Sequence, residues 1–574
     1  MSAPNPPKGL MHYHLSRVGS SMGVGWFSCI PAQALDFDQA LSYSRTHPHD
    51  QFMHKYLLEL TAKYEPDQMD RLRAQARKQE DFHLLALLYE TCLLHARYQP
   101  LMQAFQGLNL AALAEHSPLI YIPWSQESNR EDNFYWLRAF SANANLLTPL
   151  PAPEEAAFPI PFGHDLIDGW RRGVVHLKDL VSPTQGGHAP SDSRPAKERA
   201  KKLRNAMETL GILTGWETRT EATLSPYAIE RPWNLDITVE DGRNQCRLSG
   251  ILTGYGRGFN VHQGRISCLM ETVERYSAFA TIRSGRTEGH TKDYALHRAR
   301  YEDLKKKGPS VLDPQQICLE VAYQDQSLAW IQGERRAPEG VHPVYVPAQL
   351  VFLFSNLDEK SLTTGLPSNG LAAGNTMEEA KVSALLEVIE RDAEKVVPYS
   401  GHRCFVLEAE DPKVSDLLEG HKKKGIHIQF MDMTPEFGIP CFKAFIQGPG
   451  GVILKGSGAH LDAKRAVASA MTEIPYPYPY WFGSMPAPWD LPIRYYEDLP
   501  NYSSDKAPQD LETLERLLIL NGYHPIYVDL TRKDLKIPVV KALIPGLEMM
   551  TVVDRFSPLG LRQFGHYLRD VSKA

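Results

Sequence analysis

Two segments of the chain repeat one arrangement of ionisable and hydroxyl side chains. ISCLMETVER (266–275) and VSALLEVIER (382–391) both read Ser-x-x-x-Glu-x-x-Glu-Arg after one apolar residue. On an α-helix, the offsets 0, +4, +7 and +8 fall at about 0°, 40°, 340° and 80°, so these side chains share one stripe. The stripes consist of Ser267, Glu271, Glu274 and Arg275, and of Ser383, Glu387, Glu390 and Arg391. The remaining positions are mostly apolar, which predicts two largely buried helices.

Buried carboxylates of this kind need partners. A poorly solvated carboxylate either meets a cation or takes up a proton. If the two helices face each other, four carboxylates meet two guanidinium groups. Divalent cations are the obvious source of the positive charge that is still missing. Mg²⁺ prefers carboxylate oxygens and usually accompanies nucleotide phosphates, which arginine binds in forked geometry. The pattern therefore predicts one site for Mg²⁺ and a nucleotide, shared by both helices.

The repeat extends beyond the stripes. Thirteen residues before Ser267, Ser383 and Ser469 stand Gly254, Gly370 and Gly456, and Glu473 lies four residues after the last serine. A second repeat relates GIHIQFMDMTPEFGIPCFKAFI (425–446) to GYHPIYVDLTRKDLKIPVVKALI (522–544). We interpret this as a strand, glycine turn and helix unit used three times. The third copy is altered, because Tyr476 and Pro477 replace its Glu-Arg pair.

The glycines suggest how a phosphate could approach. Glycine lets backbone N–H groups come close to an anion at the start of a helix. Arg257, within GYGRG, adds a cation there and is a predicted nucleotide contact. The chain contains no GxxxxGK[ST] loop, and GYGRGF is not the GxGxxG of a dinucleotide unit. We therefore expect the glycine turns to present phosphate groups to the two helices.

Three segments together resemble a known family. SNGLAAGNTMEEAKVSALLEVIERDA, GRGFNVHQGRISCLMETVERYSA and DLTRKDLKIPVVKALIPGLE resemble the hallmark segments of the YcaO superfamily. The resemblance implies an ATP-dependent enzyme that phosphorylates a backbone amide oxygen of a peptide. A nucleophile then attacks the activated carbon, giving an azoline from a Cys, Ser or Thr side chain or a thioamide from sulfide, with ADP and phosphate as further products.

The resemblance also implies roles for individual residues. The Mg²⁺ ligands would be Glu271, Glu274, Glu387 and Glu390. The contacts to ATP or its ions would be Ser267, Arg275, Asn369, Ser383 and Arg391. Among these residues, Glu271, Glu387 and Arg391 would form the catalytic set, with ATP and Mg²⁺ as cofactors. Phosphoryl transfer needs charge neutralisation and alignment more than covalent help, and no separate general base is visible in the sequence.

Composition excludes several classes of protein. The net charge of −6, with 43% hydrophobic and 23% charged residues, shows no basic excess for nucleic acid. Seven cysteines without CxxC spacing indicate neither a disulfide framework nor a zinc ribbon, which favours a reducing cytoplasm. No apolar run approaches the roughly 18 to 20 residues of a membrane span, and the first residues lack a secretion signal. We expect a cytoplasmic protein without a membrane span.

The chain divides into three predicted parts with an α+β fold. DQFMHKYLLELTAKY and DFHLLALLYETCLLHARY indicate paired helices, so residues 1–180 are a predicted, mainly helical domain of unknown role. VSPTQGGHAPSDSRPAK (181–197) is a predicted linker. Residues 198–574 alternate strand-like and helical pieces and form the predicted YcaO-like domain, with Mg·ATP bound between helices.

The end of the chain bears on the reaction. Azoline-forming relatives commonly end in a Pro-rich PxPxP tail, whereas this chain ends GHYLRDVSKA, which favours a thioamide or another non-azoline product. Two alternatives stay open. One is a nucleotide-binding accessory protein that assists another modification enzyme, such as a ribosomal-protein methylthiotransferase. The other is an ATP-dependent ligase with a carboxylate substrate.

Partners follow from the same resemblance. We expect a peptide or protein substrate, a TfuA-like or other maturation protein as a partner, and a homodimer. The tract PYPYPYWFGSMPAPW (475–489) is either an extended lid or aromatic platform for a peptide, or a packed surface loop.

Overall fold

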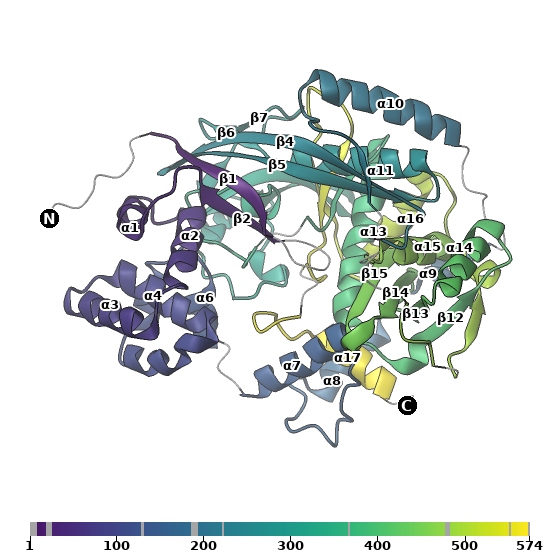
Figure 1. Ribbon diagram of the computed structural model, residues 1–574, viewed down its shortest axis with the longest axis horizontal. Coiled ribbons are helices and arrows are strands. Elements are labelled where there is room, and N and C mark those ends of the chain that lie inside the picture. The colour runs from purple at the N-terminus through teal and green to yellow at the C-terminus, as the bar shows by residue number, and fades with distance from the viewer. Residues whose placement is uncertain are drawn as a thin grey trace.

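The computed structural model describes most of the chain. The described residues are 9–18, 26–127, 131–184, 193–220, 223–365, 368–476, 483–488, 490–549 and 553–571. Residues 185–192 of the predicted linker and residues 477–482 and 489 of the aromatic tract lie outside them. Helices surround and separate three sheets within the described chain, which confirms the predicted α+β fold (Figure 1).

The first sheet is built on a long hairpin. Its strand order is β2 (Trp26–Pro31), β1 (Met11–Val18), β5 (Asn244–Gly258), β4 (Tyr227–Asp241), β6 (Thr281–Arg283) and β7 (Arg286–Glu288), and β3 (Thr218–Thr220) pairs with β4. β1 runs parallel to β5, with Tyr13 opposite Leu248. The first strands of the chain thus belong to the same sheet as the hairpin that leads into the first motif helix.

The other two sheets carry the repeated strand segments. The second has the order β10 (Gly340–Pro347), β9 (Leu328–Ala337), β17 (Ile526–Asp529), β18 (Val539–Leu543) and β11 (Leu371–Ala373), and β8 (His297–Ala299) pairs with β9. The third has the order β15 (Ile453–Ala459), β14 (Cys441–Gln447), β13 (Gln429–Asp432), β12 (Cys404–Glu408) and β16 (Ile493–Tyr495).

Three helices follow strands in the same way. α11 (Val261–Ala278) follows β5, α13 (Met377–Val396) follows β11, and α15 (Ala463–Glu473) follows β15. Asn260, Thr376 and Asp462 cap them, each accepting a hydrogen bond from a backbone N–H of the first turn. Each cap stands six residues after the repeated glycine of its unit. The predicted threefold succession of a strand and a helix is confirmed, while the glycine forms a turn in one copy.

The repeated glycines have a different role from the predicted one. Gly254 and Gly456 lie within β5 and β15 rather than in turns. A Cβ on Gly254 would lie 2.2 Å from Thr272 Oγ1, and one on Gly456 would lie 2.5 Å from the carbonyl oxygen of Ala470. Gly254 and Gly456 therefore do not form the expected glycine turns, and they let a helix pack directly on its strand, whereas a role in presenting phosphates stays a prediction. Only Gly370, at φ +75°, forms a turn.

Further helices cover the sheets. Towards the start of the chain lie α1 (Phe37–Thr46), α2 (Gln51–Thr61), α3 (Pro66–Lys78), α4 (Phe82–Leu94), α5 (Leu110–Ala114), α6 (Tyr121–Glu127), α7 (Glu131–Leu146), α8 (His164–Arg172) and α9 (Leu177–Leu180). Later ones are α10 (Ser193–Thr209), α12 (Tyr301–Lys306), α14 (Pro412–Lys423), α16 (Ala507–Leu520) and α17 (Leu561–Val571). α7 and α8 pack against α17 through Trp136, Ile167 and Phe564.

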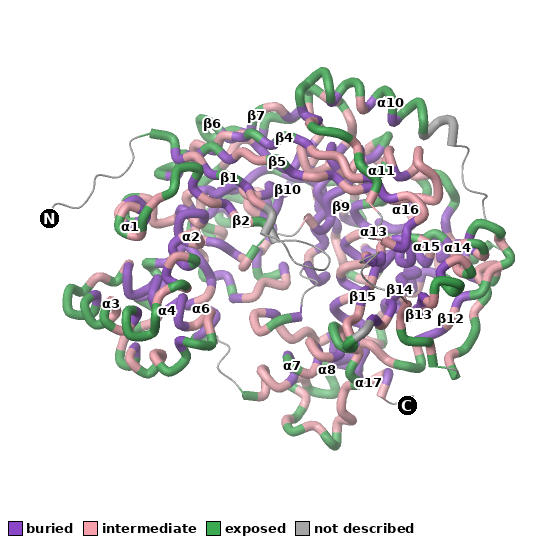
Figure 2. The backbone as a smooth tube through the Cα atoms, in the orientation of Figure 1, coloured by how far each residue is buried: buried purple, intermediate pink, exposed green. Residues whose placement is uncertain are grey.

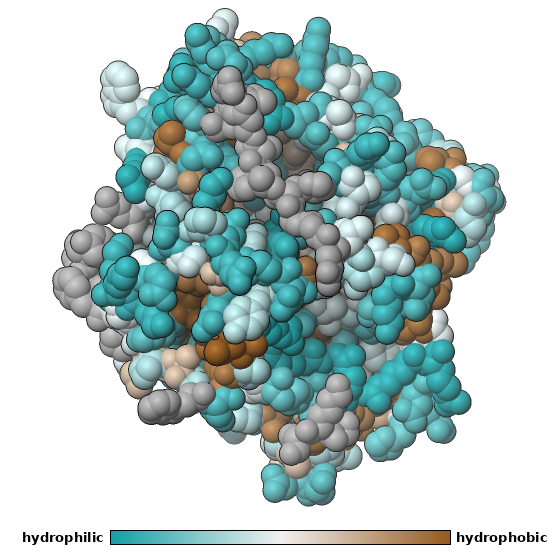
Figure 3. All heavy atoms as spheres, turned by 90° about the vertical axis from the view of Figure 1, so that its right-hand side faces the viewer, coloured by the Kyte–Doolittle hydropathy of each residue, from teal (hydrophilic) through white to brown (hydrophobic). Residues whose placement is uncertain are grey.

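The core joins regions far apart in sequence. Leu57 and Leu87 of the early helices share one buried cluster with Leu248 and Trp330 of the first two sheets (Figure 2). Hydrophilic residues cover most of the face shown in Figure 3. All seven cysteines are unpaired, as expected. In the described chain, none of the helices is long and apolar enough to cross a bilayer.

Candidate nucleotide-binding site

The glutamates of α11 are held by two contacts. Arg275 lies 2.8 Å from the carboxylate of Glu274 and 3.6 Å from that of Glu271. The other oxygen of Glu271 accepts a hydrogen bond of 2.6 Å from the backbone N–H of Tyr255 on β5. The first stripe thus forms on one helix as predicted, and the preceding strand fixes its orientation.

The third sheet holds the glutamates of α13. Glu390 accepts hydrogen bonds from Ser457 Oγ at 2.9 Å and from the backbone N–H of Ala459 at 3.0 Å. Arg391 donates to the same Ser457 hydroxyl at 3.2 Å. It also lies 2.8 Å from Glu394 and 3.3 Å from Glu390. Arg391 is therefore fixed in position by one helix and one strand.

The altered third copy contributes to the same site. Glu473, at the end of α15, lies 3.6 Å from the guanidinium of Arg257 on β5. Burial raises the pKa of Glu473, an effect that Arg257 and Arg391 oppose and that Glu394 and Glu271 reinforce. Glu473 thus stands in the electrostatic environment of both complete motif copies, a role that the sequence left uncertain.

The two stripes face each other. Burial raises the pKa of Glu274 well above its usual range, and Glu387 across the site raises it further. Burial also raises the pKa of Glu387, which Arg391, Arg275 and Lys541 act to lower. The pKa of Glu390 is raised to about 8, chiefly by burial. Both helices therefore bring carboxylates into one poorly solvated space.

Sequence reasoning missed two buried lysines. Lys541 on β18 is 1% exposed, donates to the backbone carbonyl of Asn369 at 2.7 Å and interacts electrostatically with Glu387 and Glu274. Lys443 on β14 is 3% exposed and interacts with Glu394. Burial lowers the pKa of each to about 8. Their signal was present in the sequence: IPCFKA and IPVVKA place a lysine at the same position of two apolar strands.

The charge balance differs from the predicted one. Six glutamates of the described chain meet at this site: Glu271, Glu274, Glu387, Glu390, Glu394 and Glu473. Six cations face them: Arg257, Arg275, Arg391, Lys443, Lys455 and Lys541. The prediction of four carboxylates against two guanidinium groups was incomplete, because strand residues supply the missing positive charge. A formally balanced site suits a polyphosphate that brings its own divalent counterions.

The remaining predicted contacts lie around this cluster. Ser267 and Ser383 are exposed, one helical turn before Glu271 and Glu387, and no hydrogen bond between them and a described residue is observed. Asn369 is 5% exposed and donates to the carbonyl of Met549 at 3.0 Å. Its Oδ1 is buried without a hydrogen-bond partner in the described chain. That oxygen is available to a bound group.

The donor atoms suit Mg²⁺ and a nucleotide. In the part of the chain that the structure describes, no three His, Cys, Asp or Glu side chains already stand close enough to hold a metal, because the glutamates contact arginines. The carboxylate oxygens are nevertheless the ligands that Mg²⁺ prefers, and the unpartnered Asn369 Oδ1 adds another acceptor. The chemistry of the site fits the predicted group.

The family comparison covers this site. The family described as "YcaO cyclodehydratase, ATP- and Mg²⁺-binding" matches residues 255–475 and 478–548, just over half of the chain. An uncharacterized protein of Methanothermobacter thermautotrophicus is 29% identical over 55% of this chain and 85% of its own length. An uncharacterized protein of the tfuA 3′ region of Rhizobium leguminosarum bv. trifolii is 32% identical, over 38% of this chain and only 53% of that protein.

Solved structures are similar at lower identity. The YcaO protein of Methanopyrus kandleri bound with AMPPCP and Mg²⁺ is 21% identical, with a TM-score of 0.45 over 64% of this chain and 94% of that one. A heterocyclase in complex with substrate and cofactor is also 21% identical, with a TM-score of 0.49 over 70% of this chain and 60% of that one. On the extent of the family match, the chain belongs to the YcaO family, whose domain binds ATP and Mg²⁺.

Proposed function

We propose that this protein uses ATP and Mg²⁺ to activate a backbone amide of a peptide or protein, leading to a thioamide or azoline-type product. The observation that supports the proposal is the meeting of α11 and α13, which places two Glu-Glu-Arg stripes around one half-buried space. Lys541 and Arg257 add cations to it from two different sheets. Such an arrangement neutralises and aligns phosphate groups, the main requirement of phosphoryl transfer.

Different residues would bind the metal, contact the phosphate oxygens and hold these contacts in position. Mg²⁺ held by Glu271, Glu274, Glu387 and Glu390 would neutralise charge on the phosphate oxygens. Arg275 and Arg391 offer forked donors to the same oxygens. Ser457 and Glu394 hold Arg391 in place before a ligand arrives, so little side-chain entropy is lost on binding.

The proposed reaction balances as two displacements. The amide oxygen attacks the γ-phosphorus of ATP, a P–O bond forms, and ADP leaves. The nucleophile then adds to the activated carbon, and phosphate departs with the former amide oxygen. With sulfide the peptide exchanges one oxygen for sulfur, whereas a side-chain Cys, Ser or Thr closes a ring with loss of one water.

Sulfide is the nucleophile we favour. The Rhizobium relative is described as a protein of the tfuA 3′ region, which supports a TfuA-like partner for this chain. A homodimer stays a prediction, to be checked by analytical ultracentrifugation.

Mass spectrometry tests the proposed function. The protein is incubated with ATP, Mg²⁺, sulfide and the peptides and proteins of cells from which its gene has been deleted. We expect ADP, phosphate and a substrate in which sulfur replaces one oxygen, all absent with Glu387→Gln. Consumption of ATP with every peptide unchanged would contradict amide activation and favour an accessory role.

A further inference from the structure

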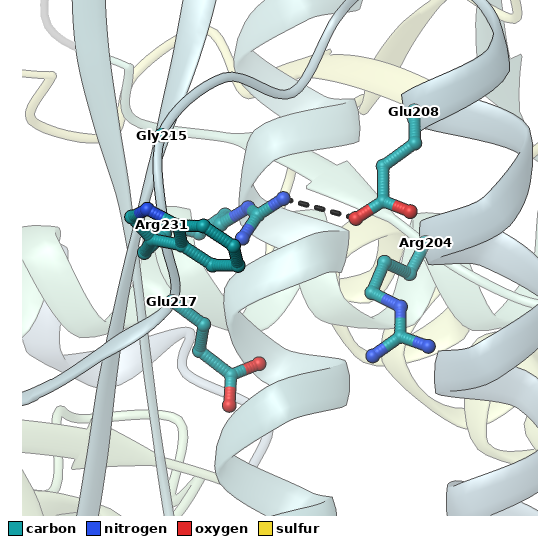
Figure 4. A pocket seen from close by; sticks show the side chains of 6 residues that line it. Arg204, Glu208, Gly215, Glu217 and Arg231 are labelled. Atoms are coloured by element: carbon teal, nitrogen blue, oxygen red, sulfur yellow. Dashed lines mark hydrogen bonds and ion pairs between the residues drawn. The ribbon is translucent and has the colours of Figure 1, made fainter.

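A cavity whose lining residues differ from those of the carboxylate site lies against α10. It encloses about 500 Å³, which is within the usual range of ligand pockets, and is lined by Arg204, Glu208, Gly215, Trp216, Glu217 and Arg231. Figure 4 shows Arg204 and Glu208 reaching in from α10, with Arg231 and Glu217 on the opposite side. All six residues precede the part of the chain that matches the YcaO family.

The arginines of this cavity are incompletely satisfied. Arg231 donates to Glu208 at 3.0 Å, but its Nε is buried without a hydrogen-bond partner. The Nε of Arg204 is also buried and unpartnered, and no ion pair of Arg204 with a described residue is observed. A buried N–H without an acceptor is destabilising, typically by about 1–3 kcal/mol. Both Nε atoms are shielded from solvent, so the donors that a ligand can reach are the terminal nitrogens of Arg204, for which no hydrogen bond to a described residue is observed.

Trp216 gives the cavity an apolar wall. The residue is 86% exposed, although an indole of this size normally packs against other groups. It follows Gly215, whose φ of +61° is favourable only for glycine or a few polar residues. The backbone of this turn therefore holds the tryptophan in an exposed position. A ligand with an aromatic or large apolar group would cover it.

The charges select among anionic ligands. Three arginines, Arg204, Arg231 and Arg265, face two glutamates, since Arg265 holds Glu217 through hydrogen bonds of 2.6 and 2.7 Å. One positive charge is left over. Both glutamates repel any anion, but they repel a polyphosphate with several negative charges more strongly than a single carboxylate, which the one surplus positive charge can neutralise. This favours a carboxylate beside an apolar side chain.

We infer that this cavity binds an acidic segment of a peptide, with a carboxylate on Arg204 and a neighbouring aromatic side chain on Trp216. α10 is anchored on the core by Ala200, Leu203 and Met207 and packs against α11, so a bound segment would lie beside the helix that carries Glu271. That this peptide is the substrate rests on the proposed function. The binding itself does not.

Fluorescence anisotropy tests the inference without ATP or Mg²⁺. The probe is a short fluorescein-labelled peptide with Phe-Glu pairs in a Gly-Ser background, and its counterpart carries Gln for Glu. We expect the Glu peptide to bind, and Arg204→Gln, Trp216→Ala and the Gln peptide each to weaken binding by roughly tenfold or more. Lys202→Gln, two residues earlier on an exposed part of α10, makes the same charge change and should leave binding unchanged.

The outcomes separate this inference from the proposed function. Glu387→Gln should bind the peptide like the wild type, whatever its effect on ATP. Equal binding of the Glu and Gln peptides, wild-type binding by Arg204→Gln, or no binding by the wild-type protein would overturn the inference. Near-unchanged circular dichroism of the Arg204 and Trp216 variants establishes that a loss is local.

Discussion

Lys443 and Lys541 occupy the same position in two repeated strand segments, and each is buried beside glutamates of α13. Lys541 interacts with Glu387, whereas Lys443 interacts with Glu394, two turns further along the helix. The repeat thus supplies α13 with a buried ammonium group from each of two sheets. Removing one ammonium group takes away part of the positive charge that neutralises a neighbouring carboxylate.

Lys541→Met should weaken nucleotide binding more than Lys443→Met does. Both substitutions should destabilise the protein, by about 3–5 kcal/mol if the carboxylates stay charged. Only Lys541 also interacts with Glu274 and Arg275, so its loss disturbs both motif helices. Calorimetric titration with ATP and Mg²⁺ should show at least a roughly tenfold loss for Lys541→Met. Equal affinities for the two variants would contradict the central placement of Lys541.

Gly256→Ala should disrupt the packing of α11 on β5. The new Cβ would lie 2.0 Å from the backbone nitrogen of Cys268 and 2.2 Å from the carbonyl of Gly264, so strand and helix must separate. We expect a loss of about 1–3 kcal/mol or more in denaturant unfolding. Gly420→Ala in α14, where nothing lies within 4 Å, is the control and should be neutral or slightly stabilising. A Gly256→Ala protein as stable as this control would show that the contact is not tight.

Local patterns made the motif helices predictable. The apolar positions around Glu271 and Glu387 carry helical periodicity, and the offsets alone place the glutamates and arginine on one stripe. The early helices follow the same logic, since Phe52 and Leu57 lie in α2 and Leu84 and Leu88 in α4. Glu473 could be found from its register with Glu271 and Glu387, but its role could not.

Long-range strand pairing could not be predicted from local patterns, and the charge compensation by strand lysines was missed. β1 pairs with β5 although more than two hundred residues separate Tyr13 from Leu248, and no local pattern specifies that choice of partner. Lys443 and Lys541 were overlooked because a lysine in an apolar strand has no periodic signature. The glycines were misassigned because a close helix-to-strand contact and a turn both require glycine.

Glu390 should make the stability of the ion-free protein depend on pH. Burial raises its folded-state pKa to about 8 from an ordinary 4.5. A carboxyl group with a raised folded pKa contributes stability that is fully present below the unfolded value and is lost as pH rises through the folded value. As pH rises from 5 to 8, the free energy of unfolding of the wild type should therefore fall by about 1 kcal/mol or more relative to that of Glu390→Gln. Urea unfolding of both proteins measures it, and a constant difference would contradict the buried placement of Glu390.

Arg562→Met should loosen α17 from α13. Arg562 donates to both oxygens of Asp392, at 2.5 and 2.7 Å, and to Glu436 at 2.8 Å. Losing the guanidinium removes the arginine from two buried carboxylates, leaving Asp392 with the backbone N–H of Glu548 and Glu436 with His566, and we expect about 3–5 kcal/mol of destabilisation. Arg516→Met on exposed α16 surface is the matched control and should change stability by less than about 0.5 kcal/mol. Similar unfolding of the two variants would rule out this anchoring.

The central claim is that Glu387 helps to form one Mg·ATP site between α11 and α13. Calorimetric titration of the wild type, Glu387→Gln and the control Glu378→Gln with ATP in the presence of Mg²⁺ tests it most directly. Glu387→Gln keeps the side-chain volume but removes the charge, whereas Glu378 lies in the first turn of the same helix. We predict at least a roughly tenfold loss of affinity for Glu387→Gln and none for Glu378→Gln. Wild-type affinity in Glu387→Gln would remove this residue from the site and contradict the account.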